Sequence, residues 1–161
     1  MNKNKMIPII AAIVFIIVVV TALIYLLYPK ILLSGNVKVK INSQEWRVEV
    51  AQNDWSRAKG LSGRKFIGEN DGMLFIFNEP AIQKFWMRGM KFPLDIIWIK
   101  NNKVVGLAEN VSPATISNLE LRSSPEPVNL VLEINAGSAK KWGIREGSEV
   151  FIYSGGKLVL Y

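Results

Sequence analysis

Residues 72–99 read GMLFIFNEPAIQKFWMRGMKFPLDIIWI and decide how the remainder of the chain is interpreted. This stretch gathers aromatic and β-branched residues into apolar runs that are interrupted by prolines and a polar turn, which is typical of strands in a buried sheet. Trp86, Met87, Arg88 and Asp95 lie between these runs or at their margins. Charged groups beside apolar strands need partners, so the same stretch also supplies candidate site residues.

Alternating patterns on either side of this stretch extend the sheet. Residues 36–41 and 45–50 alternate apolar with charged side chains, which predicts a β-hairpin. Further strands are predicted at residues 73–77, 84–87, 94–99, 103–108 and 128–134, with two more at the C-terminus around a Gly155-Gly156 turn. Short helices are predicted at residues 55–61 and 136–142, and a long loop at residues 109–127. The expected fold class is mainly β (α+β), a single compact β-barrel-like domain with short helices.

The N-terminal part has a different composition. Residues 6–28, MIPIIAAIVFIIVVVTALIYLLY, contain no charged side chain, and a helix of this length crosses about 30 Å of hydrocarbon, which predicts one transmembrane helix. Lys3 and Lys5 precede it and Lys30 alone follows closely, so the positive-inside rule predicts a cytoplasmic N-terminus and an extracytoplasmic domain at the cell membrane. A cleaved signal peptide is the alternative, although its apolar core is normally shorter. The expected organisation is an N-terminus (1–5), a transmembrane helix (6–28), a linker (29–35) and one domain (36–161).

The composition excludes several kinds of chemistry. The 161 residues include no Cys and no His, which removes thiolate nucleophiles, Ser-His-Asp catalysis and the usual zinc sites. Asp54, Asp71 and Asp95 are scattered without the spacing of a calcium loop, so neither a metal nor a cofactor is expected. The net charge is +7, but three of the lysines belong to the N-terminal part and no basic run exceeds two residues. No nucleic-acid partner is therefore expected.

Seven motifs follow one another in a specific order: GLSGRKF (60–66), DGMLFIF (71–77), FWMRGM (85–90), FPLDIIWI (92–99), ENVSPA (109–114), VLEINAG (131–137) and GIREGSEV (143–150). In this order they resemble the DUF192 (UPF0127) family of uncharacterised proteins, over about residues 37–153. The resemblance implies a compact, mainly β domain that is often exported or membrane-attached, and it implies no established activity or cofactor. The chain departs from the family pattern at Ser62, where Met is usual, and at Gly89-Met90, where small polar residues are usual.

Arg64, Trp86, Arg88 and Asp95 are the candidate ligand-binding residues, and we expect them to line one small polar site at an end of the sheet. Burying Asp95 without a partner costs several kcal/mol. The planar guanidinium of Arg64 suits a carboxylate, so a structural ion pair between them is one interpretation and a substrate-facing pair is the other. Trp86 is interpreted either as a core residue or as a platform on which a ligand stacks.

Met87, Glu109 and Glu133 are secondary candidates. Met87 follows Trp86 in an apolar run and has the same two interpretations, a core residue or a ligand contact. Glu133 lies between two apolar residues, and strand alternation predicts that it is solvated or caps a loop rather than acting in catalysis. Glu109 and Asp95 are a weak candidate for the acid and base of a glycosidase. No catalytic residue is assigned.

Two main classes of function remain. The first is a non-catalytic, membrane-tethered module that binds a ligand or partner at the cell envelope, such as a carbohydrate or a membrane protein. The alternative is a hydrolase or transferase that acts on envelope carbohydrate through Asp or Glu acid–base chemistry. A chaperone-like assembly factor for a membrane complex is a third class that the sequence leaves open.

Overall fold

The computed structural model describes residues 12–23, 36–115 and 121–159. The chain divides into two compact units, Met1–Ser34 and Gly35–Tyr161. In the first unit, residues 12–23 are helical. A membrane-spanning helix needs about 20 apolar residues, and none of the helices in the described part of the chain is long and apolar enough to cross a membrane.

The structure therefore does not support the transmembrane helix predicted over residues 6–28, because no such helix is found among the described residues. The two ends of that prediction, residues 6–11 and 24–28, lie outside the described residues. The cellular location and orientation that were derived from it stay predictions.

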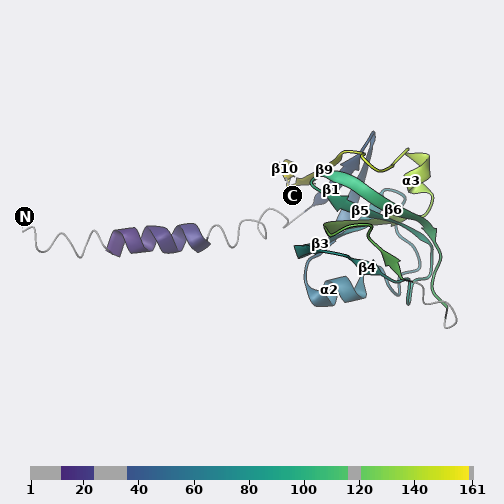
Figure 1. Cartoon of the computed structure of the whole chain (residues 1–161), viewed down its shortest axis with the longest axis horizontal. Helices are drawn as coiled ribbons and strands as arrows, with labels where there is room; N and C mark the ends of the chain where they lie inside the picture. Colours follow the sequence, from purple (N-terminus) through teal and green to yellow (C-terminus); the bar gives the residue numbers. More distant parts are fainter. Residues whose placement is uncertain (1–11, 24–35, 116–120, 160–161) are drawn as a thin grey trace, which may run out of the picture. The chain divides into compact units, whose positions relative to one another are not determined.

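The second unit is a mainly β domain (Figure 1). Its strands are β1 (Val37–Ile41), β2 (Gln44–Ala51), β3 (Asp71–Ala81), β4 (Lys84–Phe85), β5 (Leu94–Lys100), β6 (Lys103–Val111), β7 (Arg122–Ser123), β8 (Val128–Asn135), β9 (Val150–Ser154) and β10 (Lys157–Val159). Its helices are α2 (Asp54–Lys59) and α3 (Ser138–Lys141), which lie on opposite sides of the domain in Figure 1. The predicted long loop over residues 109–127 is interrupted by the end of β6, which runs on to Val111, and by β7, which is paired with β4.

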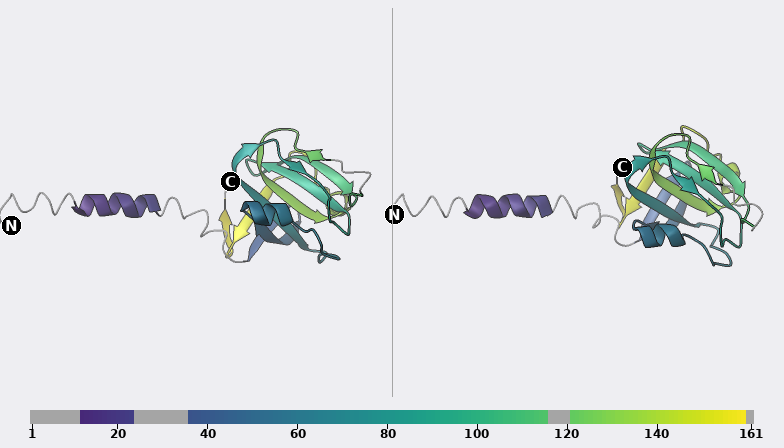
Figure 2. Two further views of the ribbon diagram at one scale, coloured as in Figure 1. Left: turned by 90° about the horizontal axis from the view of Figure 1, so that it is seen from below. Right: turned by 60° about the horizontal axis from the view of Figure 1, so that its bottom comes forward.

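Eight strands pair in the order β10-β9-β1-β2-β3-β8-β5-β6, and β4 with β7 forms a separate ribbon. The two end strands of the large sheet, β10 and β6, are not paired with each other among the described residues, so the prediction of a barrel-like domain is wrong. Figure 2 shows the sheet strongly twisted, as right-handed strand twist requires. One isolated bridge, Lys103 to Glu149, links β6 to the residue before β9 without forming a ladder.

The middle of the sheet is buried on both faces. Strand β8 pairs with β3 on one side and with β5 on the other, and all three are rich in buried apolar side chains. Successive side chains point to opposite faces of a strand, so each of these strands contributes to two apolar layers. One layer is a cluster that includes Phe75, Ile96, Trp98 and Val131. A polar side chain on either face of this region is consequently removed from bulk water.

The connection between β2 and β3 positions the site. These two strands are parallel, and a parallel pair needs a crossover, for which this chain uses the segment that contains α2. The crossover returns the chain to the sheet beside β3 and brings α2 close to its outer half, where the Arg57 guanidinium donates a hydrogen bond to the carbonyl oxygen of Ile76 at 2.8 Å.

Candidate functional site

A cavity of about 190 Å³ opens between α2, the outer half of β3 and β4. Its aromatic wall consists of Phe75, Phe77, Phe85 and Trp86. The basic side chains that line it are Arg57, Lys59, Lys84 and Arg88. Glu133 of β8 is the one carboxylate among the described residues that line it. The cavity therefore combines apolar surface, positive charge and a single acid, a composition that is typical of a ligand site.

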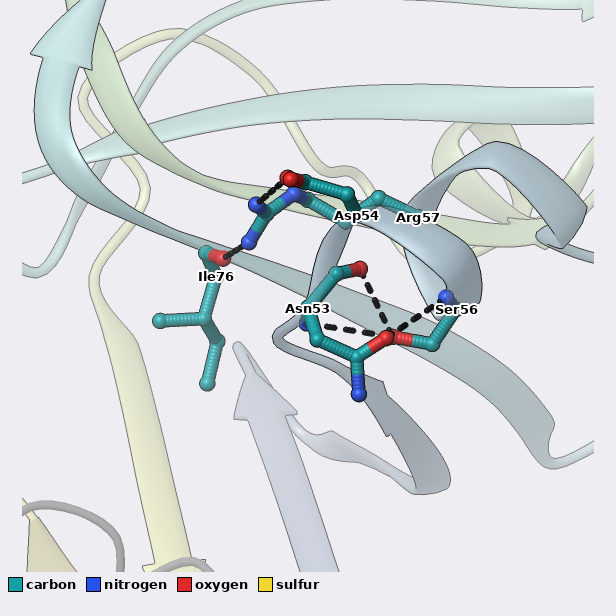
Figure 3. A network of polar contacts seen from close by, with 5 residues as sticks. All are labelled: Asn53, Asp54, Ser56, Arg57 and Ile76. Atoms are coloured by element: carbon teal, nitrogen blue, oxygen red, sulfur yellow. Dashed lines mark hydrogen bonds and ion pairs between the residues drawn. The ribbon is translucent and has the colours of Figure 1, made fainter.

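Helix α2 is too short to be stable by itself and is held by polar contacts (Figure 3). The Asn53 side chain accepts a hydrogen bond from the Ser56 backbone N–H at 2.8 Å, and the Ser56 hydroxyl accepts one from the Asn53 N–H at 3.1 Å. This reciprocal pair is a capping box. Arg57 forms an ion pair with Asp54 and reaches across to β3, so its guanidinium is fixed from two sides at the margin of the cavity.

Three of the four rings in the aromatic wall pack edge to face. The Phe75 and Phe85 ring centroids are 4.9 Å apart with an interplanar angle of 88°, and those of Phe77 and Phe85 are 6.5 Å apart at 82°. The Arg57 guanidinium lies 5.1 Å from the centroid of Phe77, a cation–π contact. Trp86 differs from these residues, since 56% of its surface is exposed. It offers a free aromatic face at the opening.

Glu133 lies on the apolar face of β8. Its register partners are Met73 on β3 and Ile96 on β5, both of them buried. Only 5% of Glu133 is exposed, and within the described residues its carboxylate forms no ion pair and accepts no hydrogen bond. Burial therefore raises the pKa of the Glu133 carboxyl to about 8, because desolvation penalises the charged form.

The family model of DUF192, whose members are described as uncharacterised, matches residues 37–152. The chain belongs to the DUF192 family. A comparison with curated proteins gave no match. The resemblance that the ordered motifs predicted is thus confirmed for the domain.

Two solved structures are similar to this DUF192 domain. A protein of unknown function from Novosphingobium aromaticivorans DSM 12444 is 34% identical with a TM-score of 0.66, and the match covers 70% of this chain and 82% of that one. A proposed transcription regulator from Sinorhizobium meliloti 1021 is 29% identical with a TM-score of 0.67, covering 76% of this chain and 96% of that one. Both likenesses concern the fold of the domain.

Ser62, which lines the cavity, lies directly against Gly89. A Cβ atom on Gly89 would lie 2.2 Å from the Ser62 hydroxyl oxygen, and Gly89 has a φ of +74°. The backbone N–H of Gly63 also donates to the Gly89 carbonyl oxygen at 2.9 Å. The small residue at each position lets the loop after α2 and the loop after β4 pack directly against each other, next to Arg88 in the sequence.

Of the four residues that we expected to share a site, the DUF192 domain brings Trp86 and Arg88 to the cavity. Trp86 is an exposed lining residue and not a core residue. Met87, by contrast, is only 2% exposed and belongs to the apolar cluster, so its core interpretation is the one that the structure supports. The predicted strand at residues 84–87 is limited to Lys84–Phe85, which leaves the next residues free to form the cavity margin.

Arg64 does not contact Asp95, and the proposed ion pair between them is wrong. The Arg64 guanidinium forms a bidentate pair with Glu49 of β2, in which Nη2 lies 2.8 Å from Oε2. This contact lowers the pKa of the Glu49 carboxyl. Arg64 lines a separate surface hollow together with Arg47 and Asp71, outside the cavity.

Asp95 is fully buried, and its partners are backbone groups. Its Oδ1 accepts the Asn110 N–H at 2.8 Å and its Oδ2 accepts the Ala139 N–H at 2.8 Å. The first bond ties β5 to a bulged part of β6, and the second holds the start of α3. Asp95 is thus a structural link, and Glu109, which is exposed and does not line the cavity, cannot form an acid–base pair with it there.

The expectation that Glu133 is solvated or caps a loop is wrong. Strand alternation predicted correctly that Glu133 turns away from Leu132 and Ile134, but both faces of β8 are covered in this fold. No sequence pattern indicated the other lining residues, among them Arg57, Phe75 and Lys84, because they come from three separate elements. The apolar neighbours of Glu133 in VLEIN were the one indication that an acid enters the interior.

Proposed function

We propose that the domain is a non-catalytic module that binds a small anionic molecule with a ring-shaped body in the cavity. The observation that carries this proposal is the meeting of four aromatic and four basic side chains at one cavity. Aromatic faces favour a flat or ring-shaped apolar surface, and basic side chains attract and orient an anion. Sugar acids of the cell envelope are one source of such ligands and aromatic acids are another.

A titration of the isotope-labelled, full-length protein with D-glucuronate and with benzoate tests the proposal and distinguishes the two sources. Resonances of the Trp86 side chain and of α2 are expected to shift with at least one of the two acids. Benzylamine, which has a similar ring but a positive charge, is the matched control and is expected to leave them in place. Equal shifts with benzylamine and benzoate would contradict an anion site.

Arg88→Gln is expected to weaken binding of the anion about fivefold, which corresponds to roughly 1 kcal/mol for a solvent-accessible charge contact. Arg145→Gln removes the same charge from an exposed position that does not line the cavity and is the matched control. An equal loss in both variants would mean that only net charge matters.

One observation favours the alternative of a hydrolase or transferase. A carboxyl in a cavity with its pKa raised to about 8 can act as a general acid at neutral pH. A two-carboxylate mechanism lacks its second member, however, because Glu133 is alone among the acids of the described lining residues. Release of 4-nitrophenol from 4-nitrophenyl glucuronide that is lost in Glu133→Gln would support the enzyme; the absence of turnover supports a binding module.

A further inference from the structure

The charge of the Glu133 carboxyl matters for a cavity that binds an anion. An ionised carboxylate at the floor of such a cavity would repel the anion that the basic side chains attract. In most buried sites a carboxylate is paired with a cation or accepts hydrogen bonds. Glu133 has neither among the described residues, although it lines the cavity.

The groups around Glu133 explain why it stays unpaired. The two strands beside it contribute Met73 and Ile96, which do not titrate. The acid on β5, Asp95, pairs in register with Ile134 and so belongs to the opposite face, where backbone N–H groups occupy it. Neither register partner of Glu133 therefore titrates, and Asp71, the acid two residues before Met73 on the same face of β3, is paired with Arg47.

The remaining elements packed around the cavity contribute only basic groups, which are Arg57 and Lys59 from α2, Lys84 from β4 and Arg88 from the loop after it. None of them forms an ion pair with Glu133 in the described structure. Arg57 is engaged with Asp54 and with the β3 backbone, and Lys59 lies 4.9 Å from the ring centroid of Trp55. Desolvation therefore acts on Glu133 without compensation.

We propose that Glu133 binds the ligand as a neutral carboxylic acid and donates its proton in a hydrogen bond to an oxygen of the ligand's acidic group. This inference rests on the proposed function. It adds which residue recognises the acidic group of the ligand, namely Glu133, and in which protonation state. The bond pairs a neutral donor with a charged acceptor, which is stronger than a bond between two neutral groups. The basic side chains then bind the same anion from the open side.

Binding through the neutral form of Glu133 depends on pH. Burial raises the pKa of the Glu133 carboxyl to about 8, so the neutral form predominates at neutral pH. When only that form is competent, the apparent Kd rises by the inverse of its fraction, which is about tenfold one pH unit above the pKa. Binding near pH 8 must also take up protons, because the bound anion favours the neutral acid.

Benzoate and D-glucuronate are suitable probes because both stay ionised between about pH 6 and about pH 9, so any pH dependence belongs to the protein. The full-length protein is titrated with each probe at both pH values. The expected apparent Kd is about tenfold higher at the higher pH. Calorimetry near pH 8 in two buffers of different ionisation enthalpy is expected to show proton uptake on binding.

Three variants make the test specific. Glu133→Gln keeps a hydrogen-bond donor of the same shape but cannot titrate, so its Kd is expected to be the same at both pH values. Glu133→Leu removes the donor and is expected to bind more weakly than Glu133→Gln throughout. Glu109→Gln changes an exposed acid outside the cavity and is expected to keep the tenfold ratio of the native protein.

The outcomes separate this inference from the proposed function. Probe binding that is equally strong at both pH values in the native protein, or a Glu133→Gln variant that keeps the native pH dependence, overturns the role of Glu133 and leaves the ligand site intact. Absence of binding of both probes at every pH overturns the proposed function and this inference together. Backbone amide spectra of each variant confirm that the fold is retained.

Discussion

Two buried carboxylates lie on neighbouring strands of the same sheet and are treated in opposite ways. Asp95 on β5 is fully buried and accepts two backbone hydrogen bonds at 2.8 Å each. Glu133 on β8 is 5% exposed, lines a cavity and has apolar register partners. The register pairs Asp95 with Ile134 and Glu133 with Ile96, so the two acids point to opposite faces.

The groups around a buried carboxylate indicate whether it serves the fold or a site. A carboxylate such as that of Asp95, which is fully buried outside the cavity and accepts a backbone hydrogen bond on each oxygen, has a structural task. A carboxylate with empty acceptors beside a cavity lowers stability when it is ionised, and such groups concentrate at functional sites. Asp95 therefore has a structural role, whereas Glu133 is the buried acid that we propose for the ligand site.

The largest effect is expected for Asp95→Ala, which leaves two buried backbone N–H groups without an acceptor. At about 1–3 kcal/mol for each unsatisfied group, the free energy of unfolding should fall by about 2–6 kcal/mol. Asp95→Asn keeps one acceptor oxygen, so its free energy of unfolding should lie between those of the native protein and the alanine variant. Urea unfolding measures the free energy of unfolding of both variants. Glu109→Ala changes an exposed residue and is the control, with an expected loss of less than about 0.5 kcal/mol. A loss for Asp95→Ala as small as that of the control would remove the structural assignment.

Glu133 is expected to give the protein a dependence of stability on pH. Its pKa is about 8 in the folded state and 4.5 as the ordinary value, so between these values the folded protein binds more protons than the unfolded chain. Stability therefore falls as the pH rises through this window, by at most about 1.4 kcal/mol per pH unit, and levels off above it. Urea unfolding across the window should show the slope in the native protein and lose it in Glu133→Gln. If Glu133→Gln keeps the same dependence of stability on pH, another titrating group causes it.

Gly89→Ala is expected to destabilise the contact between the loops beside the cavity and to leave the hydrogen bonds of Asp95 unchanged. The left-handed backbone costs an alanine about 1–2 kcal/mol, and the clash with the Ser62 hydroxyl adds to it. Gly63→Ala is the matched control, because Gly63 has a φ of +82° but open space around its Cβ position. The excess cost of Gly89→Ala over Gly63→Ala, measured by thermal unfolding, isolates the contact between the two loops. Equal costs would show that this contact does not matter.

The smallest effect is expected for Arg64→Gln, even though Arg64 was the predicted partner of Asp95. Its ion pair with Glu49 is solvent-accessible on both sides, so its loss should cost less than about 1 kcal/mol. A double-mutant cycle with Asp95→Asn should show no coupling, because the two residues share no partner. Significant coupling between the two substitutions would support an interaction between Arg64 and Asp95.

The strands and their alternation could be predicted from the sequence because period-2 patterns reflect burial on one face. The hairpin of β1 and β2 is a prediction of this kind, and the structure confirms it. The family was predicted from the resemblance of the ordered motifs, and the family model confirms it. Glu133 was misinterpreted for a specific reason. Alternation tells which side chains share a face, but it does not tell that both faces of a central strand are covered.

The cavity could not be predicted, because its walls come from segments far apart in the chain. Arg57 follows a capping box that the sequence does indicate, whereas its contact with Ile76 depends on the crossover between parallel strands. Asp95 illustrates the same limit. The need for a partner was clear from its apolar surroundings, but the backbone N–H groups of Asn110 and Ala139 carry no side-chain signal that a sequence displays.

The order of the strands also has a consequence for how the protein is made. Strand β8 fills the space between β3 and β5, both of which leave the ribosome much earlier. Until β8 is synthesised, each of these strands has an unpaired, apolar edge, which exposes the nascent chain to wrong pairing and delays productive folding. Glu133 belongs to the strand that ends this vulnerable period, so the buried acid of the cavity is put in place only when the centre of the sheet closes.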